Sequence, residues 1–178
     1  MKVIRKSMNR EEVASLVCVT LERHGIEAVL SGGSVVSIYS DNQYESYDLD
    51  FIATGLGRPV ARAMSELGFE AEGRHWVHPD TPYWVEFPAG PVQIGGMLVT
   101  EFAERTTRFG VLRLLHPTDC VMDRLAAYIH WNDTESLEQA ILVARSQPID
   151  MERIAAWADA EGGSEQFAEF SKRYSLRP

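Results

Sequence analysis

The sequence predicts an α+β fold, in which a sheet with flanking helices precedes a helical C-terminal part. Segments of helical and strand periodicity alternate over the first part of the chain. Turn residues then separate short apolar and aromatic runs over residues 69–115, which indicates successive strands. After Pro117 the pattern stays helical. We therefore expect an α/β core over residues 1–116 and a helical region over residues 117–178 packed on it.

Local signals predict each element in order. Asn9 and Glu12 form a capping-box pattern ahead of a helix that Gly25 ends, and Gly68 is placed to close a later helix. Residues 40–46 form a polar loop. We expect strands at residues 26–30 and 47–52, and helices at residues 35–39, 58–67, 118–130, 134–145, 151–160 and 164–174.

Composition limits the classes of function. The 178 residues include 17 Lys and Arg and 26 Asp and Glu, so the formal net charge is −9. This balance argues against broad nonspecific binding of nucleic acid, because neutralising phosphates needs an excess of Lys and Arg. A bound metal ion could supply positive charge locally. Two cysteines form no disulfide framework, and no signal peptide or membrane-spanning run is recognised, so we expect a cytoplasmic protein with no membrane partner.

One constellation points to chemistry. Gly32 and Gly33 follow a predicted strand and permit a tight turn, and Ser34 then lies near a helix N-terminus, where phosphate binding is favoured. Thirteen residues later come Asp48 and Asp50. Because they are two positions apart on a predicted strand, both carboxylates project from one face, and a divalent cation such as Mg²⁺ would relieve their repulsion.

A third acid from another strand would complete such a site. The candidate is Glu86, whose neighbours Val85 and Phe87 are expected to face the core. A metal shared with Asp48 and Asp50 would compensate its charge. Trp84 would share the face of Glu86, where it could flank a nucleotide or an acceptor.

This pattern resembles the signature of the DNA polymerase β-type nucleotidyltransferase superfamily. The resemblance lies in the Gly33–Ser34 pair, the thirteen-residue gap and the acid–hydrophobic–acid triplet that ends at Asp50. The closest resemblance is to small prokaryotic members, the AbiEii-like toxins of toxin–antitoxin systems. The resemblance covers roughly residues 26–88, and residues 117–145 are similar to the helical tail of such proteins. It implies a short mixed sheet flanked by helices. It also implies Mg²⁺- or Mn²⁺-dependent transfer of a nucleoside monophosphate from an NTP to a hydroxyl acceptor, which could belong to a protein, a tRNA or a small molecule.

The resemblance also implies roles for single residues. The turn of Gly32, Gly33 and Ser34 would hold the triphosphate. Asp48 and Asp50 would bind the metals. Two further residues complete the set, Glu86 as third metal ligand and possible base and Arg124 as a phosphate contact. An antitoxin-like protein partner is a further expectation.

Simpler interpretations remain open for the same residues. Asp48 and Asp50 could lie on a solvated edge strand, Glu86 could be an exposed charge, and Arg124 could form only a salt bridge. The alternative function is a noncatalytic binding or regulatory module on the nucleotidyltransferase fold. Many members of the superfamily carry Asp where this chain has Glu86, so the third ligand decides between the two functions.

Overall fold

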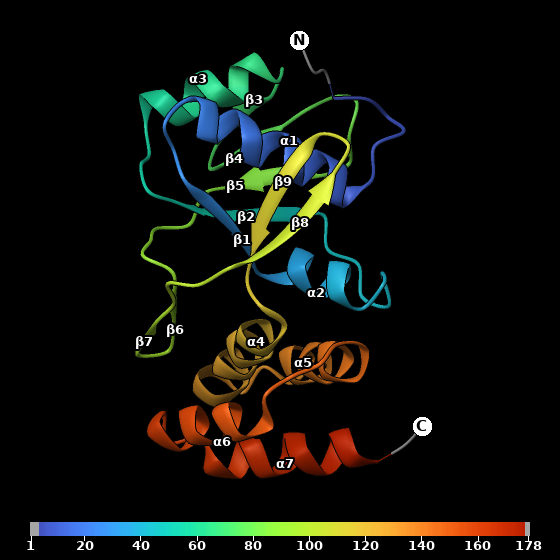
Figure 1. The fold of residues 1–178 in the computed structure, drawn as a ribbon, viewed down its shortest axis with the longest axis vertical. Coiled ribbons are helices and arrows are strands. Elements are labelled where there is room, and N and C mark those ends of the chain that lie inside the picture. The colour runs from blue at the N-terminus through green and yellow to red at the C-terminus, as the bar shows by residue number, and fades with distance from the viewer. Residues whose placement is uncertain (1–3, 177–178) are drawn as a thin grey trace.

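The computed structural model describes residues 4–176 and confirms an α+β architecture, with seven helices and a seven-stranded mixed sheet among those residues (Figure 1). The helices are α1 (Arg10–Arg23), α2 (Gly33–Tyr39), α3 (Arg58–Glu66), α4 (Pro117–Trp131), α5 (Thr134–Ser146), α6 (Met151–Ala160) and α7 (Ser164–Ser175). The strands are β1 (Ala28–Ser31), β2 (Asp48–Ala53), β3 (Glu70–Glu72), β4 (His75–Val77), β5 (Trp84–Glu86), β6 (Gln93–Ile94), β7 (Met97–Leu98), β8 (Ala103–Thr107) and β9 (Gly110–Leu114).

Local signals predicted these elements well, because each reflects short-range chemistry. The side chain of Asn9 accepts a hydrogen bond from the backbone N–H of Glu12 at 2.9 Å, and the carboxylate of Glu12 accepts one from the N–H of Asn9 at 3.2 Å. This confirms the capping box at the start of α1. Gly68 follows α3 with a φ of +87°, a conformation that favours glycine. Both cysteines are free and buried, as expected.

The main sheet has the strand order β3-β4-β5-β2-β1-β9-β8. The strands β2 and β5 are parallel, as are β1 and β9, while β1 and β2 are antiparallel. In Figure 1, α1 and α3 lie on one side of this sheet, and α2, the β6–β7 hairpin and the C-terminal helices lie on the other. The interior strand β2 is thus held between β1 and β5, so its side chains have fixed cross-strand neighbours.

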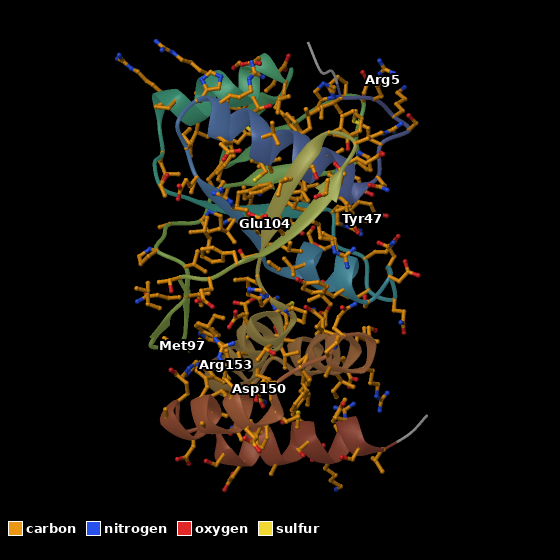
Figure 2. The ribbon with its side chains drawn as sticks, in the orientation of Figure 1. Arg5, Tyr47, Met97, Glu104, Asp150 and Arg153 are labelled. Carbon is orange, nitrogen blue, oxygen red and sulfur yellow. The ribbon has the colours of Figure 1, made fainter. Side chains whose placement is uncertain are left out.

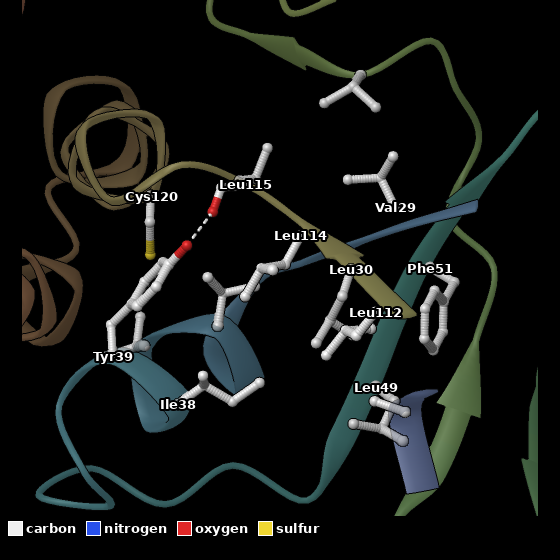
Figure 3. Close-up of a cluster of buried hydrophobic side chains, with 14 of the residues drawn as sticks. Val29, Leu30, Ile38, Tyr39, Leu49, Phe51, Leu112, Leu114, Leu115 and Cys120 are labelled. Atoms are coloured by element: carbon white, nitrogen blue, oxygen red, sulfur yellow. Dashed lines mark hydrogen bonds between the residues drawn. The ribbon is translucent and has the colours of Figure 1, made fainter. Parts of the chain in front are cut away.

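The core gives the two faces of the sheet different characters. Leu30 and Phe51 are fully buried neighbours in the β1–β2 register, while Val29 points to the opposite side (Figure 3). At the end of β9 the hydroxyl of Tyr39 donates to the carbonyl of Leu115 at 2.7 Å. Burial raises the pKa of the Tyr39 phenol, so this group stays protonated and donates the bond at neutral pH. The bond ties α2 to the segment that enters α4.

The C-terminal helices pack on the core. The helix α4 begins at Pro117, where the sequence predicted the helical region to begin. The side-chain amide of Gln147 donates to the carbonyl of Tyr39 at 2.9 Å, and the indole N–H of Trp157 donates to the carbonyl of Ile94 at 3.2 Å. These bonds hold the helical region against α2 and the β6–β7 hairpin. Over residues 4–176, we find no helix with the length and apolar character needed to cross a bilayer.

Candidate active site

Three acidic side chains lie on one face of two adjacent parallel strands. The burial of β2 alternates, with Leu49 fully buried between the partly exposed Asp48 and Asp50. In the register of β2 and β5, Asp50 lies opposite Glu86. Cross-strand neighbours share a face of a sheet. The three predicted carboxylates therefore lie together on the face that is opposite to Leu49.

The glycine turn approaches one of these carboxylates directly. Gly32 follows β1 with a φ of +71°, and a Cβ atom placed on it would lie 2.5 Å from Oδ2 of Asp50. Only glycine therefore permits both the turn and the present position of Asp50. The expected role of Gly32 and Gly33 in binding a triphosphate stays a prediction.

Ser34 has a structural bond that the sequence did not indicate. Its side chain is buried, and its hydroxyl donates to the backbone carbonyl of Asp48. The hydroxyl predicted to hold phosphate is thus occupied in tying α2 to β2. The N-terminus of α2, which starts at Gly33, has no side-chain cap.

The environment of Asp50 disfavours its negative charge. Burial, and then the charges of Asp48 and Glu86, raise the pKa of the Asp50 carboxyl from 3.8 to about 6, although Arg124 partly opposes them. Like charges held together in a partly dry site are a common property of sites that receive a cation.

Asp48 is positioned by the loop that precedes it. The hydroxyl of Ser46 donates to Oδ1 of Asp48, and the backbone N–H of Ser46 donates to the hydroxyl of Ser37 at 3.0 Å. The buried guanidinium of Arg10 donates to the carbonyl of Ser46 at 3.0 Å and also bonds to the side-chain oxygen of Asn42. The loop, for which the sequence indicates only a polar character, therefore has a defined conformation that orients Asp48.

Glu86 has side-chain partners that sequence reasoning missed. Oε1 of Glu86 lies 2.5 Å from Nε2 of His75, and Oε2 lies 3.6 Å from Nε of Arg74. Because Trp76 pairs with Val85 in the antiparallel register, His75 lies opposite Glu86. These contacts use part of the acceptor capacity of the Glu86 carboxylate and would orient it if it binds a metal.

Arg124 faces the carboxylates from the helical side. It lies on α4, forms an ion pair with Asp123 at 2.5 Å and donates to Oε1 of Gln139 at 3.4 Å. Its charge favours the ionised form of Asp50. Arg124 thus has the salt bridge of the simpler interpretation, while its predicted contact with phosphate stays untested.

Aromatic side chains border the acidic face. Trp84 lies opposite Asp48 in the register of β5 and β2. Its ring stacks against that of Tyr47 with centroids 6.4 Å apart, and Tyr47, labelled in Figure 2, is 41% exposed. An aromatic ring that is exposed and stacks on a neighbouring ring can also stack on a planar ligand.

The donor set is chemically suited to a hard cation. Aspartate oxygens are ligands that Mg²⁺ prefers, and the raised pKa of Asp50 reflects repulsion that a cation would relieve. Within residues 4–176, no three His, Cys, Asp or Glu side chains are already gathered closely enough to hold a metal ion. The site therefore offers a cation the two aspartates, whereas the carboxylate of Glu86 contacts His75.

Comparison of the chain with protein-family models, with curated proteins and with solved structures finds no match.

Proposed function

We propose that this protein has a nucleotidyltransferase fold and is a metal-dependent nucleotidyltransferase, which transfers a nucleoside monophosphate from an NTP to a hydroxyl acceptor. The observation that carries the proposal is the acidic face itself. Asp48 and Asp50 lie beside Glu86, the glycine turn leaves room for the Asp50 carboxylate, and the pKa of Asp50 is raised to about 6. A site that holds repelling carboxylates in place is suited to a divalent cation.

In this proposal Asp48 and Asp50 hold Mg²⁺ or Mn²⁺. The ion would neutralise phosphate oxygens and orient the triphosphate for in-line displacement of pyrophosphate. Ser46 and Gly32 keep the two carboxylates in position, the first by its hydrogen bond to Asp48 and the second by the space it leaves for Asp50. Arg124, whose charge acts on Asp50, would attract a phosphate oxygen.

We assign Glu86 the role of base rather than that of third metal ligand. Oε1 of Glu86 already contacts Nε2 of His75, a ring through which a proton can leave, and each carboxylate oxygen keeps a further lone pair to accept one. It accepts the proton of the acceptor hydroxyl, and His75, whose side chain is 37% exposed, connects it to solvent.

A second candidate function is a noncatalytic module on the same fold. The contacts of Glu86 with His75 and Arg74, and the occupied hydroxyl of Ser34, favour it. Such a module would bind no metal-nucleotide complex at the acidic face.

The test separates these two functions. Thermal unfolding is followed with Mg²⁺ and each NTP, and transfer is followed with α-labelled NTPs and a cell extract separated into RNA, protein and small-molecule fractions. The wild type is expected to be stabilised by metal and nucleotide together, by about 3 kcal/mol at a hundredfold excess over Kd. The double variant Asp48→Asn/Asp50→Asn is expected to lose that response and all transfer.

Asp41→Asn is the matched control, because Asp41 is an exposed aspartate outside β2. It is expected to behave as the wild type. Full transfer by the double variant would exclude the proposed mechanism, and the absence of any metal-dependent shift in the wild type would favour the noncatalytic module.

Glu86→Gln distinguishes the two roles of Glu86. If Glu86 is the base, the variant loses transfer by about 10²- to 10⁴-fold, while the Mn²⁺ concentration at half-maximal stabilisation changes by less than about twofold. Glu70→Gln, an exposed glutamate on β3, is the control. A parallel loss of Mn²⁺ affinity of about tenfold or more would instead make Glu86 a metal ligand.

A further inference from the structure

A cavity of about 720 Å³ adjoins the acidic face. Its lining includes Ile52 of β2 and Val29 of β1, which are cross-strand neighbours. Ile52 is two residues beyond Asp50 on the same strand, so the two side chains share a face and are separated by about 7 Å along it. The cavity thus lies on the same face of the sheet as the carboxylates and next to Asp50 along β2, although none of the three carboxylates lines it.

The wall of the cavity is the segment that follows Glu86 and contains β6 and β7. Gly90 lies against Ile52, since a Cβ atom on Gly90 would be 3.0 Å from Cγ2 of Ile52. The N–H of Val99 donates to the carbonyl of Val92 at 2.9 Å, which closes the base of the hairpin.

The hairpin is also held by the C-terminal helices. The indole of Trp157 bonds to the carbonyl of Ile94, and the carboxylate of Glu161 accepts from the N–H of Gly96 at 2.7 Å. Figure 2 marks the hairpin by Met97, on the same side of the sheet as these helices. The cavity therefore exists before any ligand binds, since its wall is fixed by bonds at both ends.

The chemistry of the lining selects an apolar occupant. Leu56 and Leu98 line the cavity and are 55% and 54% exposed, so an apolar ligand there would remove apolar surface from water. Among residues 4–176, the one cation of the lining is Arg113, which is already paired with Glu22 at 3.5 Å and Glu104 at 3.8 Å. Among the described residues, the lining thus has no unpaired positive charge that could bind a triphosphate. The volume of the cavity is in the range of sites for small organic ligands.

We propose that this cavity binds the apolar body of the acceptor, a small aromatic or alicyclic alcohol whose hydroxyl reaches the carboxylates. The transfer step rests on the function proposed above, but binding in the cavity does not. The hydroxyl oxygen forms a bond to the α-phosphorus of the NTP while the bond from that phosphorus to pyrophosphate breaks. The hydroxyl proton passes to Glu86, and pyrophosphate leaves.

The test uses two matched probes, naphthylethanol and ethylnaphthalene, which lacks the hydroxyl. Binding to the full chain is followed by probe fluorescence without metal or nucleotide. Both probes are expected to bind the wild type. Leu98→Glu is expected to weaken binding by about tenfold or more, because it places a charge beside the apolar body. Thr100→Trp, which adds a bulky ring at an exposed position of the lining, is expected to do the same.

Leu176→Glu is the matched control, because Leu176 is 59% exposed and does not line the cavity. It is expected to leave affinity within about twofold of the wild type. Wild-type binding that neither Leu98→Glu nor Thr100→Trp weakens, or no binding at all, would overturn the assignment of the cavity.

A second arm adds Mg²⁺ and α-labelled ATP, GTP, CTP or UTP. Label is expected on naphthylethanol and not on ethylnaphthalene, and Asp50→Asn is expected to abolish labelling while keeping probe affinity. If the wild type labels another acceptor from the extract but never bound naphthylethanol, the acceptor assignment is wrong and the proposed function stands. If the probes bind but no acceptor of any kind is labelled, the proposed transferase function is wrong. The cavity then binds an apolar ligand that is not an acceptor.

Discussion

In the absence of divalent cations, the variant Asp50→Asn is expected to be more stable than the wild type by about 3 kcal/mol at pH 7.5, and by only about 1 kcal/mol at pH 4.5. The reason is the rise of the Asp50 pKa from 3.8 to about 6, caused first by burial and then by Asp48 and Glu86. Below pH 3.8 the carboxyl is protonated in both the folded and the unfolded chain. Between pH 3.8 and 6 the folded chain holds the extra proton, so stability falls as pH rises, and above pH 6 the full destabilisation is present.

Urea unfolding with a chelator at the two pH values measures this difference. The control Asp41→Asn is expected to show no change in relative stability between them. Adding Mg²⁺ at pH 7.5 is expected to stabilise the wild type and not Asp50→Asn, since the carboxylate that repels its neighbours would then hold the cation. A variant whose relative stability is the same at both pH values would show that Asp50 is not destabilised by its surroundings.

The secondary structure was predictable because its determinants are local. The capping box at Asn9, the glycine after α3 and the proline that begins α4 each act over a few residues. The alternation of acidic and apolar residues in β2 predicts that Asp48 and Asp50 share one face, and the alternating burial of that strand confirms it. The predicted ranges of the helices and of the first two strands agree with the observed boundaries to within two residues.

The contacts of the site were less predictable, because they depend on how distant segments meet. The contact of His75 with Glu86 requires the antiparallel register of β4 and β5. The loop that joins these strands has no regular structure from which the register could be predicted. The hydroxyl of Ser34 was expected to face a ligand, but its partner is the carbonyl of Asp48, fourteen residues later. The cavity beside Ile52 depends on the path of residues 87–102, which have little regular structure.

Replacing Gly32 with alanine is expected to lower the rate of transfer strongly. The free energy of unfolding is expected to fall by little more than the cost of the strained backbone. The new Cβ atom would lie 2.5 Å from Oδ2 of Asp50, but 3.4 Å from its Cγ and 3.5 Å from its Cβ. The contact is therefore with the end of a side chain, which can rotate away while the strand stays in place. Moving a reacting or ligating group by about 1 Å can lower a rate by about 10²-fold, so transfer is expected to fall by at least that factor.

Gly57→Ala is the matched control. Gly57 is the N-cap of α3 with a φ of +82° and a ψ of −136°, against +71° and −157° for Gly32, the N-cap of α2, and no atom lies within 4 Å of a Cβ placed on Gly57. Both variants are expected to lose about 1–3 kcal/mol from this backbone conformation, and Gly32→Ala about 1 kcal/mol more from the displaced carboxylate. That additional loss is expected to vanish in an Asp50→Ala background, where the clashing atoms are gone, and only Gly32→Ala is expected to lose the Mn²⁺ response. Equal effects of the two substitutions on Mn²⁺ binding would mean that the turn is needed for folding alone, whereas the expected difference would show that Gly32 is required for the position of Asp50.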